Sequence, residues 1–183
     1  MNEPPSAALP IVPRVLLAWE LGEGLGHLVP LFALAASLRA TGVTPVFAVR
    51  DPAAARRFRG SAAFEIVQAP YWPDPQPARG PSRGYINILH ANGFHDATAL
   101  GGLLDAWDGV IAQTGASALV CEHAPSAVVA AFGRLPVSII GNGYLLPPAD
   151  GADFPPMRPD ADDPVPAVLA ARWPRGPVAR PIA

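Results

Sequence analysis

The segment of this sequence best suited to chemistry is a glycine-rich turn that ends in a histidine. It reads Glu20-Leu-Gly-Glu-Gly-Leu-Gly-His27 and follows a short apolar run. In an open parallel sheet, ligands bind beyond the carboxyl ends of the strands, where the next helix begins. Glycines there allow a tight turn close to a ligand, and a helix N-terminus carries a partial positive charge. A histidine at this place is favoured in its neutral form, which a general base needs.

Two other interpretations of this turn stay open on the residues alone. The first is a dinucleotide site, for which Asp51 stands near the end of the second apolar run, where a ribose-binding acid is expected. The glycines, however, are spaced G-x-G-x-G and not G-x-G-x-x-G. The second is purely structural: the glycines make a tight turn and His27 is a polar residue at a helix start.

The segment Gly26-His-Leu-Val-Pro30 resembles the opening of the UDP-glycosyltransferases of the GT-B class. In that family a Gly-His-x-x-Pro segment follows the first strand, and its histidine deprotonates the acceptor hydroxyl. A second segment, Ala118-Leu-Val-Cys-Glu-His-Ala-Pro125, matches in the right order. Family members have a carboxylate there, usually aspartate, that hydrogen-bonds the histidine. The resemblance therefore implies His27 as catalytic base and Glu122 as its partner.

Glu122 departs from the family pattern by one methylene group, which affects the geometry of the pair and not its chemistry. A carboxylate on the second ring nitrogen would hold one tautomer of His27 and stabilise the imidazolium once it forms. The alternative is that Glu122 only caps the helix that follows. Adjacent residues at a strand end point in different directions, so we expect Glu122 to face the cleft and His123 to face away from it.

The resemblance also implies an acceptor pocket walled by the loops that follow the strands. The substrate-binding candidates are Gly24, Gly26, Trp72, Asn142 and Tyr144. Aromatic side chains on loops suit a small apolar acceptor, although Trp72 could equally anchor its loop to the core. His90 and His95 are expected at the surface or the rim, and the four histidines show no spacing typical of a metal site.

Short apolar runs alternate with helical patterns along the chain, which predicts a doubly wound α/β fold with a mainly parallel sheet. The resemblance makes this the N-terminal, acceptor-binding half of a GT-B glycosyltransferase. The expected strands are 14–19, 43–49, 64–67, 118–121 and 137–140. Helices are expected after Gly26, after Asp51, over 100–111 with Asp96 or Thr98 as cap, and over 125–132. Gly101 and Gly102 interrupt the third of these helices without an evident reason.

The composition limits the classes of function. The chain has 183 residues, a net charge of −2 and a single cysteine, Cys121. Without a basic excess we expect no nucleic-acid partner, and a lone cysteine fits a reducing compartment. No signal peptide or membrane span is evident, so a cytoplasmic location is expected. All basic residues are arginines, which suggests a GC-rich, bacterial coding sequence.

The expected organisation is a disordered N-terminus over 1–13, one Rossmann-like domain over 14–146, and a proline-rich loop and tail over 147–183. The family's donor-binding domain has no counterpart in this sequence. The resemblance implies a nucleotide-diphosphate sugar as co-substrate and no cofactor, and we expect the chain alone to be inactive in transfer. The rival hypothesis is a non-catalytic module that binds a small ligand, associates with itself or pairs with a separate donor-binding chain; a dinucleotide-dependent enzyme is the third.

Overall fold

A parallel sheet of five strands forms the centre of the computed structural model, which describes residues 12–75 and 85–141. The strand order is β3-β2-β1-β4-β5, and all four strand pairs are parallel. The strands are β1 (Arg14–Trp19), β2 (Thr44–Val49), β3 (Glu65–Gln68), β4 (Ala118–Glu122) and β5 (Val137–Ile140). The expected α/β fold is confirmed, and within the described residues the sheet is wholly parallel.

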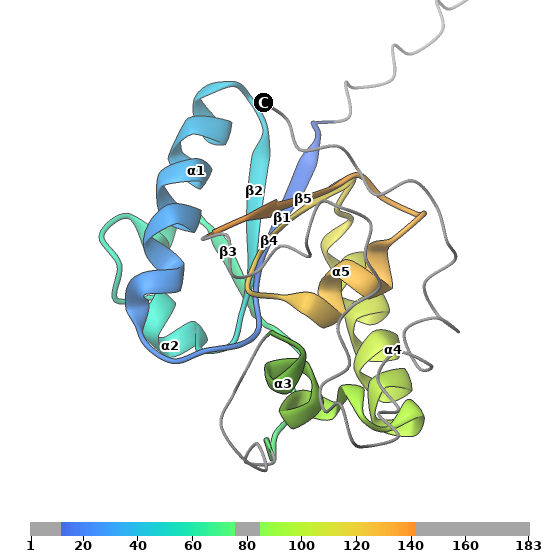
Figure 1. The fold of residues 1–183 in the computed structure, drawn as a ribbon. Coiled ribbons are helices and arrows are strands. Elements are labelled where there is room, and N and C mark those ends of the chain that lie inside the picture. Colours follow the sequence, from blue (N-terminus) through green and yellow to red (C-terminus); the bar gives the residue numbers. More distant parts are fainter. Residues whose placement is uncertain (1–11, 76–84, 142–183) are drawn as a thin grey trace, which may run out of the picture.

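Helices cover both faces of the sheet (Figure 1). One face carries α1 (Leu28–Ala40) and α2 (Pro52–Ala55), and the other carries α4 (Ala97–Thr114) and α5 (Pro125–Ala131). The helix α3 (Tyr85–Leu89) lies below the sheet in this view and leads through an irregular turn, η3 (His90–Phe94), into α4. Two short 3-10 turns complete the fold: η1 (Leu25–His27) precedes α1, and η2 (Ser61–Ala63) precedes β3.

Alternation along the strands sorts the core into two clusters. Leu16 and Ala18 of β1 pack in the cluster beneath α4 and α5, whereas Leu17 and Trp19 pack in the cluster beneath α1. All four side chains are buried. Successive side chains of a strand point to opposite faces, and helices on both faces leave no side of β1 in water. The continuous apolar run that predicted this strand is therefore what a doubly covered parallel strand requires.

The helix starts follow the capping chemistry expected from the sequence. Asp51 Oδ1 accepts a hydrogen bond of 2.8 Å from Ala54 N, and Asp96 Oδ1 accepts from the amides of Thr98 and Ala99. These bonds satisfy N–H groups that a helix start leaves unpaired. Asp96, and not Thr98, is thus the cap of α4. The observed strands differ from the expected ones by one residue at most at either end.

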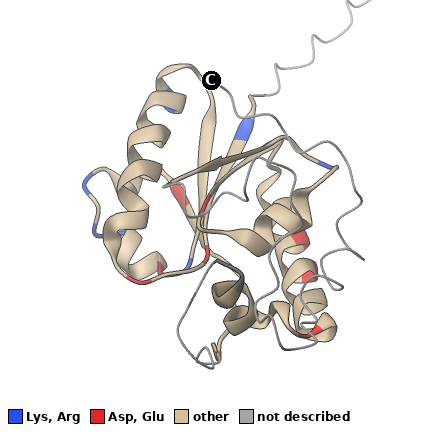
Figure 2. Cartoon of the chain, in the orientation of Figure 1, with Lys and Arg blue, Asp and Glu red and all other residues tan. Residues whose placement is uncertain are grey.

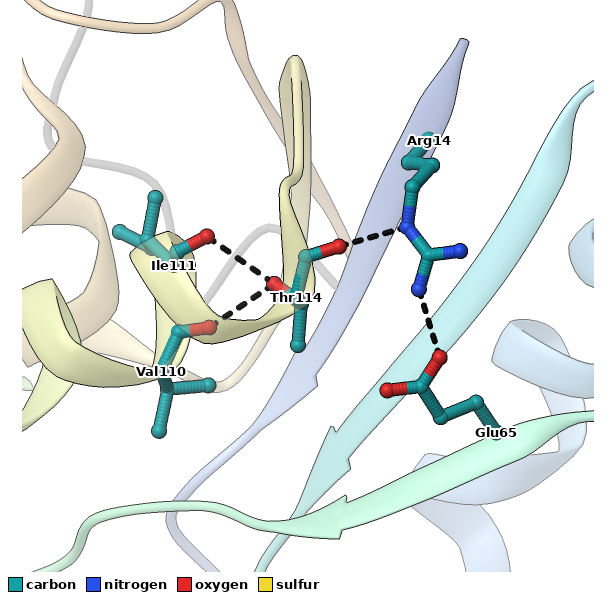
Figure 3. A network of polar contacts seen from close by, with 5 residues as sticks. All are labelled: Arg14, Glu65, Val110, Ile111 and Thr114. Atoms are coloured by element: carbon teal, nitrogen blue, oxygen red, sulfur yellow. Dashed lines mark hydrogen bonds and ion pairs between the residues drawn. The ribbon is translucent and has the colours of Figure 1, made fainter. Parts of the chain in front are cut away.

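The amino end of the sheet is held by Arg14, far along β1 from the glycine-rich turn (Figure 3). Its Nε donates to the carbonyl oxygen of Thr114 at 2.5 Å, and its Nη2 lies 2.6 Å from Glu65 Oε2. The Thr114 hydroxyl donates back to the carbonyl of Val110. One side chain thereby ties β1 to β3 and to the end of α4.

Charged residues are sparse and lie mostly on helices and connecting turns; those of α4 are acidic, and those of the turn after α2 are basic (Figure 2). Among the described residues, none of the helices combines the length and apolar character that crossing a bilayer demands. Asn142, Tyr144 and the expected tail over 147–183 lie outside the described residues, as do residues 1–11 of the N-terminus.

Candidate active site

The glycine-rich turn lies where the strand order of the sheet reverses. The chain leaves β1 toward β2 and β3 on one side, and later returns to place β4 on the other side of β1. In open α/β sheets this switch point leaves a crevice beyond the carboxyl ends of the two strands. His27 follows β1 and Glu122 ends β4, so the topology brings both residues to the same crevice.

His27 and Glu122 are in direct contact. The distance between His27 Nδ1 and Glu122 Oε2 is 2.6 Å, and the two side chains are 24% and 8% exposed. The strand register explains the contact, because Val120 packs on the α1 side of the sheet and Glu122 follows two residues later. An ionised carboxylate can only accept. With Glu122 ionised, Nδ1 therefore carries the proton and the lone pair of His27 is on Nε2.

The pKa of Glu122 is raised by burial, and the charge and the hydrogen bond of His27 act against that rise. A buried carboxylate without such a partner would be costly. His27 is therefore the group that allows the Glu122 carboxyl to be ionised although it is largely buried.

Trp19 supplies a flat surface for the His27 ring. The two rings are stacked, with centroids 5.5 Å apart and planes 20° apart. Trp19 is itself held, because its Nε1 donates a buried hydrogen bond of 2.7 Å to the carbonyl oxygen of Leu21. The end of β1 thus orients the ring that Glu122 polarises.

Gly22 approaches His27 so closely that no other residue fits in its place. A Cβ atom added at Gly22 would lie 2.5 Å from His27 Nε2, and Gly22 has a φ of +87°. Both features require glycine, since a positive φ is unfavourable for other residues. The sequence predicted a tight turn here, but not that one glycine would lie against the basic nitrogen.

Replacing Gly22 with alanine is expected to destabilise the protein by about 2–4 kcal/mol and to displace the His27 ring. About 1–2 kcal/mol comes from the positive φ, and the remainder from overpacking against the imidazole. Urea denaturation measures the loss, and the histidine ring signals in NMR spectra report the displacement.

Gly24 provides the matched control. Its φ is +91°, but the space around an added Cβ is empty to 4 Å. Gly24→Ala should therefore show only the backbone cost and leave the His27 ring signals in place. Equal effects of the two substitutions would contradict the proposed contact.

His123 lies beside His27, contrary to our expectation that it faces away. Their ring centroids are 5.4 Å apart. Strand alternation did not hold at this residue because its φ is +50°, in the left-handed region. Among the described residues other than glycine, only His123 has a positive φ.

Glu20 is a buried carboxyl group that sequence reasoning did not single out. Its side chain is 0% exposed and points to the α5 side, where Oε2 accepts a hydrogen bond of 3.0 Å from Ser126 N. Its Oε1 has no hydrogen-bond partner among the described residues. Burial raises its pKa to about 7, and hydrogen bonds with Ser126 and the charge of Arg50 act in the other direction. The signal available in the sequence was an acidic residue directly after a buried strand.

Two cavities adjoin this region, and Tyr71 lines both of them. The smaller, of about 360 Å³, is lined by Trp19, Gly22, Glu23, Gly24, Arg50, Asp51 and Tyr71. The larger, of about 660 Å³, lies between the 70–73 segment and the first turns of α4. The Arg50 guanidinium lies 4.7 Å from the centre of the Tyr71 ring.

The remaining candidate residues are divided among these cavities. Gly24 lines the smaller one, whereas Gly26 lies in η1 and lines neither. Trp72 lines the larger cavity and also packs against Gly93, where an added Cβ would lie 3.2 Å from its ring. Trp72 therefore both lines the cavity and holds its own loop against Gly93. Gly102 opens onto the same cavity, which gives this one of the two adjacent glycines of α4 a structural reason.

His90 and His95 are half-buried and pack against each other, with ring centroids 4.7 Å apart. His95 Nδ1 lies 2.7 Å from the His90 carbonyl oxygen, and His95 is among the residues that line the larger cavity. Asp51, the acid of the dinucleotide hypothesis, uses Oδ1 to cap α2 and also lines the smaller cavity.

Comparison with known proteins gives matches in structure only. No protein-family model and no curated protein matches the sequence. The solved structures similar to this chain include MurG of Acinetobacter baumannii, with 21% identity over 69% of this chain and a TM-score of 0.46. They also include LpCGTa in complex with UDP (24% over 70%, TM-score 0.41) and a UDP-glucosyltransferase from Polygonum tinctorium capable of glucosylating indoxyl (22% over 70%, TM-score 0.42).

These structural neighbours are GT-B glycosyltransferases. The matches cover 34%, 29% and 28% of the neighbours' own chains, so this chain spans about a third of their length. The α/β fold is what the chain shares with them; their substrates belong to those proteins.

Proposed function

We propose that this domain binds the acceptor of a glycosyl transfer and supplies the base that activates its hydroxyl group. The observation that carries the proposal is the contact of 2.6 Å between His27 Nδ1 and Glu122 Oε2 at the switch point of the sheet. The likeness of the two sequence segments to the UDP-glycosyltransferases supports the same function.

In the proposed reaction, His27 Nε2 removes the proton of the acceptor hydroxyl as its oxygen attacks the anomeric carbon of a nucleotide-diphosphate sugar. The bond between that carbon and the diphosphate breaks, and the diphosphate leaves with the electron pair, so the anomeric configuration inverts. Glu122 holds the Nδ1 proton and stabilises the imidazolium that results. A general base of this kind contributes about 10²–10⁴-fold to the rate.

The two cavities that share Tyr71 are the proposed acceptor site. The smaller lies beside Gly22, which touches His27, so an acceptor hydroxyl placed there would be near the base. The larger is lined mostly by apolar side chains and by the exposed face of α4 around Gly102. This combination suits a small, flat and largely apolar acceptor that carries one hydroxyl group.

The donor sugar requires a second binding surface. The described residues form a single sheet with its covering helices. Leu25 and Val29, each two residues from His27 in the chain, are apolar but 46% and 58% exposed, which suits contact with a donor-binding segment or chain. We therefore propose that transfer needs such a partner, because positioning of donor and acceptor is a large part of the rate.

Acceptor binding tests the proposal directly. A panel of phenols and aromatic alcohols titrated into the purified chain should include compounds that shift the His27 ring signals and quench tryptophan fluorescence. Gly102→Trp is expected to weaken their binding at least 10-fold, because an added side chain enters the larger cavity without meeting other atoms within 4 Å of its Cβ.

Gly109→Trp is the control for this experiment. Gly109 lies in the same helix, has equal space around it and lines neither cavity. A panel without binders, or equal weakening by both tryptophan variants, would refute the acceptor site. Tight binding of a nicotinamide dinucleotide at the glycine-rich turn would favour the dinucleotide hypothesis. Transfer from a nucleotide sugar by the purified chain alone would refute the need for a partner.

A further inference from the structure

His123 combines a strained main chain with a ring placed against the proposed base. Its φ of +50° lies in the left-handed region, which residues other than glycine adopt at a cost in energy. Such outliers cluster at functional sites, where the surrounding structure holds them in place. The positive φ of His123 therefore points to a role of this residue at the site.

The left-handed turn brings a third side chain to His27. Leu119 and Cys121 of β4 pack on the α5 side of the sheet, so regular alternation would send residue 123 to that side as well. The turn instead places the His123 ring 5.4 Å from the His27 ring, with 39° between the planes. His123, like Glu122, therefore lies beside the His27 imidazole.

The main-chain carbonyl of His123 forms hydrogen bonds with the residues that directly follow β1. The carbonyl oxygen accepts hydrogen bonds from Leu21 N at 2.9 Å and, more weakly, from Glu20 N at 3.4 Å. These bonds continue the pairing of β1 with β4 past the last strand residues. They fix the place where the glycine-rich turn begins.

Gly22 lies close to both imidazoles. A Cβ at this glycine would lie 2.5 Å from His27 Nε2 and 3.2 Å from His123 Nδ1. His27 Nε2 and the His123 ring thus both lie against the main chain of Gly22.

His123 remains uncharged at neutral pH. Burial and the charge of His27 together lower its pKa to about 4, and a hydrogen bond with the Leu21 main chain acts in the other direction. A neutral ring at this place does not repel the imidazolium that forms when His27 takes a proton. So low a pKa also makes His123 a poor base itself.

We propose that His123 is a positioning residue for His27, whose ring keeps Nδ1 of His27 on Glu122 and Nε2 directed at Gly22. The positive φ is the conformation that puts the His123 ring there. Only the catalytic meaning of this inference rests on the proposed function; the positioning itself can be measured on the chain as it is.

The test is an NMR measurement of the His27 ring nitrogens in the full chain. The parent protein should show a protected Nδ1 proton. His123→Gly removes the ring and also relieves the positive φ, so the fold is expected to be kept. In this variant the Nδ1 proton should exchange with water at least 10-fold faster. His123→Asn, which tolerates the left-handed region, should have the same effect.

Leu119→Ala separates positioning from a general loosening of the fold. Leu119 is a buried residue of β4 on the opposite side of the sheet from Glu122. This variant should lose stability and yet keep the His27 signals of the parent. Unchanged His27 signals in both His123 variants would overturn the inference, as would an equal change in Leu119→Ala.

The inference and the proposed function can fail separately. If no hydroxyl compound binds but His123→Gly frees the Nδ1 proton, the positioning role stands and the proposed function is lost. If acceptors bind and the proton stays protected in both His123 variants, only the positioning role is lost.

Discussion

Glu20→Gln is expected to be about 3 kcal/mol more stable than the parent chain above pH 7. In the folded protein, burial raises the pKa of Glu20 from 4.5 to about 7, and one pH unit of pKa change corresponds to about 1.36 kcal/mol. The folded state binds more protons than the unfolded state between these values, so the parent loses stability as pH rises from about 4.5 to about 7. Glutamine does not titrate and avoids that loss.

Urea denaturation of both proteins at pH 4.5, 6 and 8 measures this effect. The difference in unfolding free energy should be small at pH 4.5 and should grow until about pH 7. Glu23→Gln is the control, because Glu23 is an exposed carboxyl group in the same turn and should change stability by less than about 0.5 kcal/mol. A constant difference at all three pH values would show that Glu20 does not titrate as its burial requires.

His27→Ala is expected to destabilise the chain by about 1–3 kcal/mol at pH 8. The substitution leaves Glu122, which is 8% exposed, without the hydrogen bond of 2.6 Å, and an unsatisfied buried group costs about that much. Without its partner, the pKa of Glu122 should rise further. The cost should therefore fall toward pH 5, where the folded protein can keep this carboxyl protonated.

A double-mutant cycle with Glu122→Gln isolates the contact. The His27→Ala substitution should cost at least about 1 kcal/mol less in the Glu122→Gln background, because glutamine carries no charge to be left unpaired. His95→Ala is the control for His27→Ala in both backgrounds. The His95 ring is also half-buried, but it bonds a main-chain carbonyl and not Glu122, so its cost should not depend on the Glu122→Gln substitution. Additive effects of the two substitutions at His27 and Glu122 would show that the pair contributes no interaction energy.

The elements of the fold were predictable because each depends on a local rule. The apolar run of Arg14–Trp19 is typical of a strand covered on both faces, and Asp51 and Asp96 cap helices through their own side chains. The meeting of His27 with Glu122 was expected only from the resemblance of two segments to the UDP-glycosyltransferases, and the sheet topology accounts for it. Parallel strands place their carboxyl ends at one edge, so motifs that follow adjacent strands come together there.

Three features of the site depended on long-range packing and could not be predicted. Gly22 looked like any turn glycine, because only the folded chain brings His27 Nε2 against it. His123 was expected on the wrong side, because its positive φ breaks the alternation on which the expectation rested. Glu20 directly follows a buried strand, but its position in the sequence did not show that its side chain would be fully buried beside Ser126, which is 106 residues further along the chain.

The sequence by itself thus determined the doubly wound class of the fold and the helix starts, whereas the pairing of a histidine with a carboxylate was implied by the resemblance of two segments to a known family. The fold class and the helix starts follow from side-chain periodicity and capping groups, which act over a few residues. Only the tertiary structure decided which nitrogen of His27 is available, what confines it and in which direction burial shifts the pKa of the neighbouring groups. Those properties depend on how closely distant segments approach and how much water they exclude.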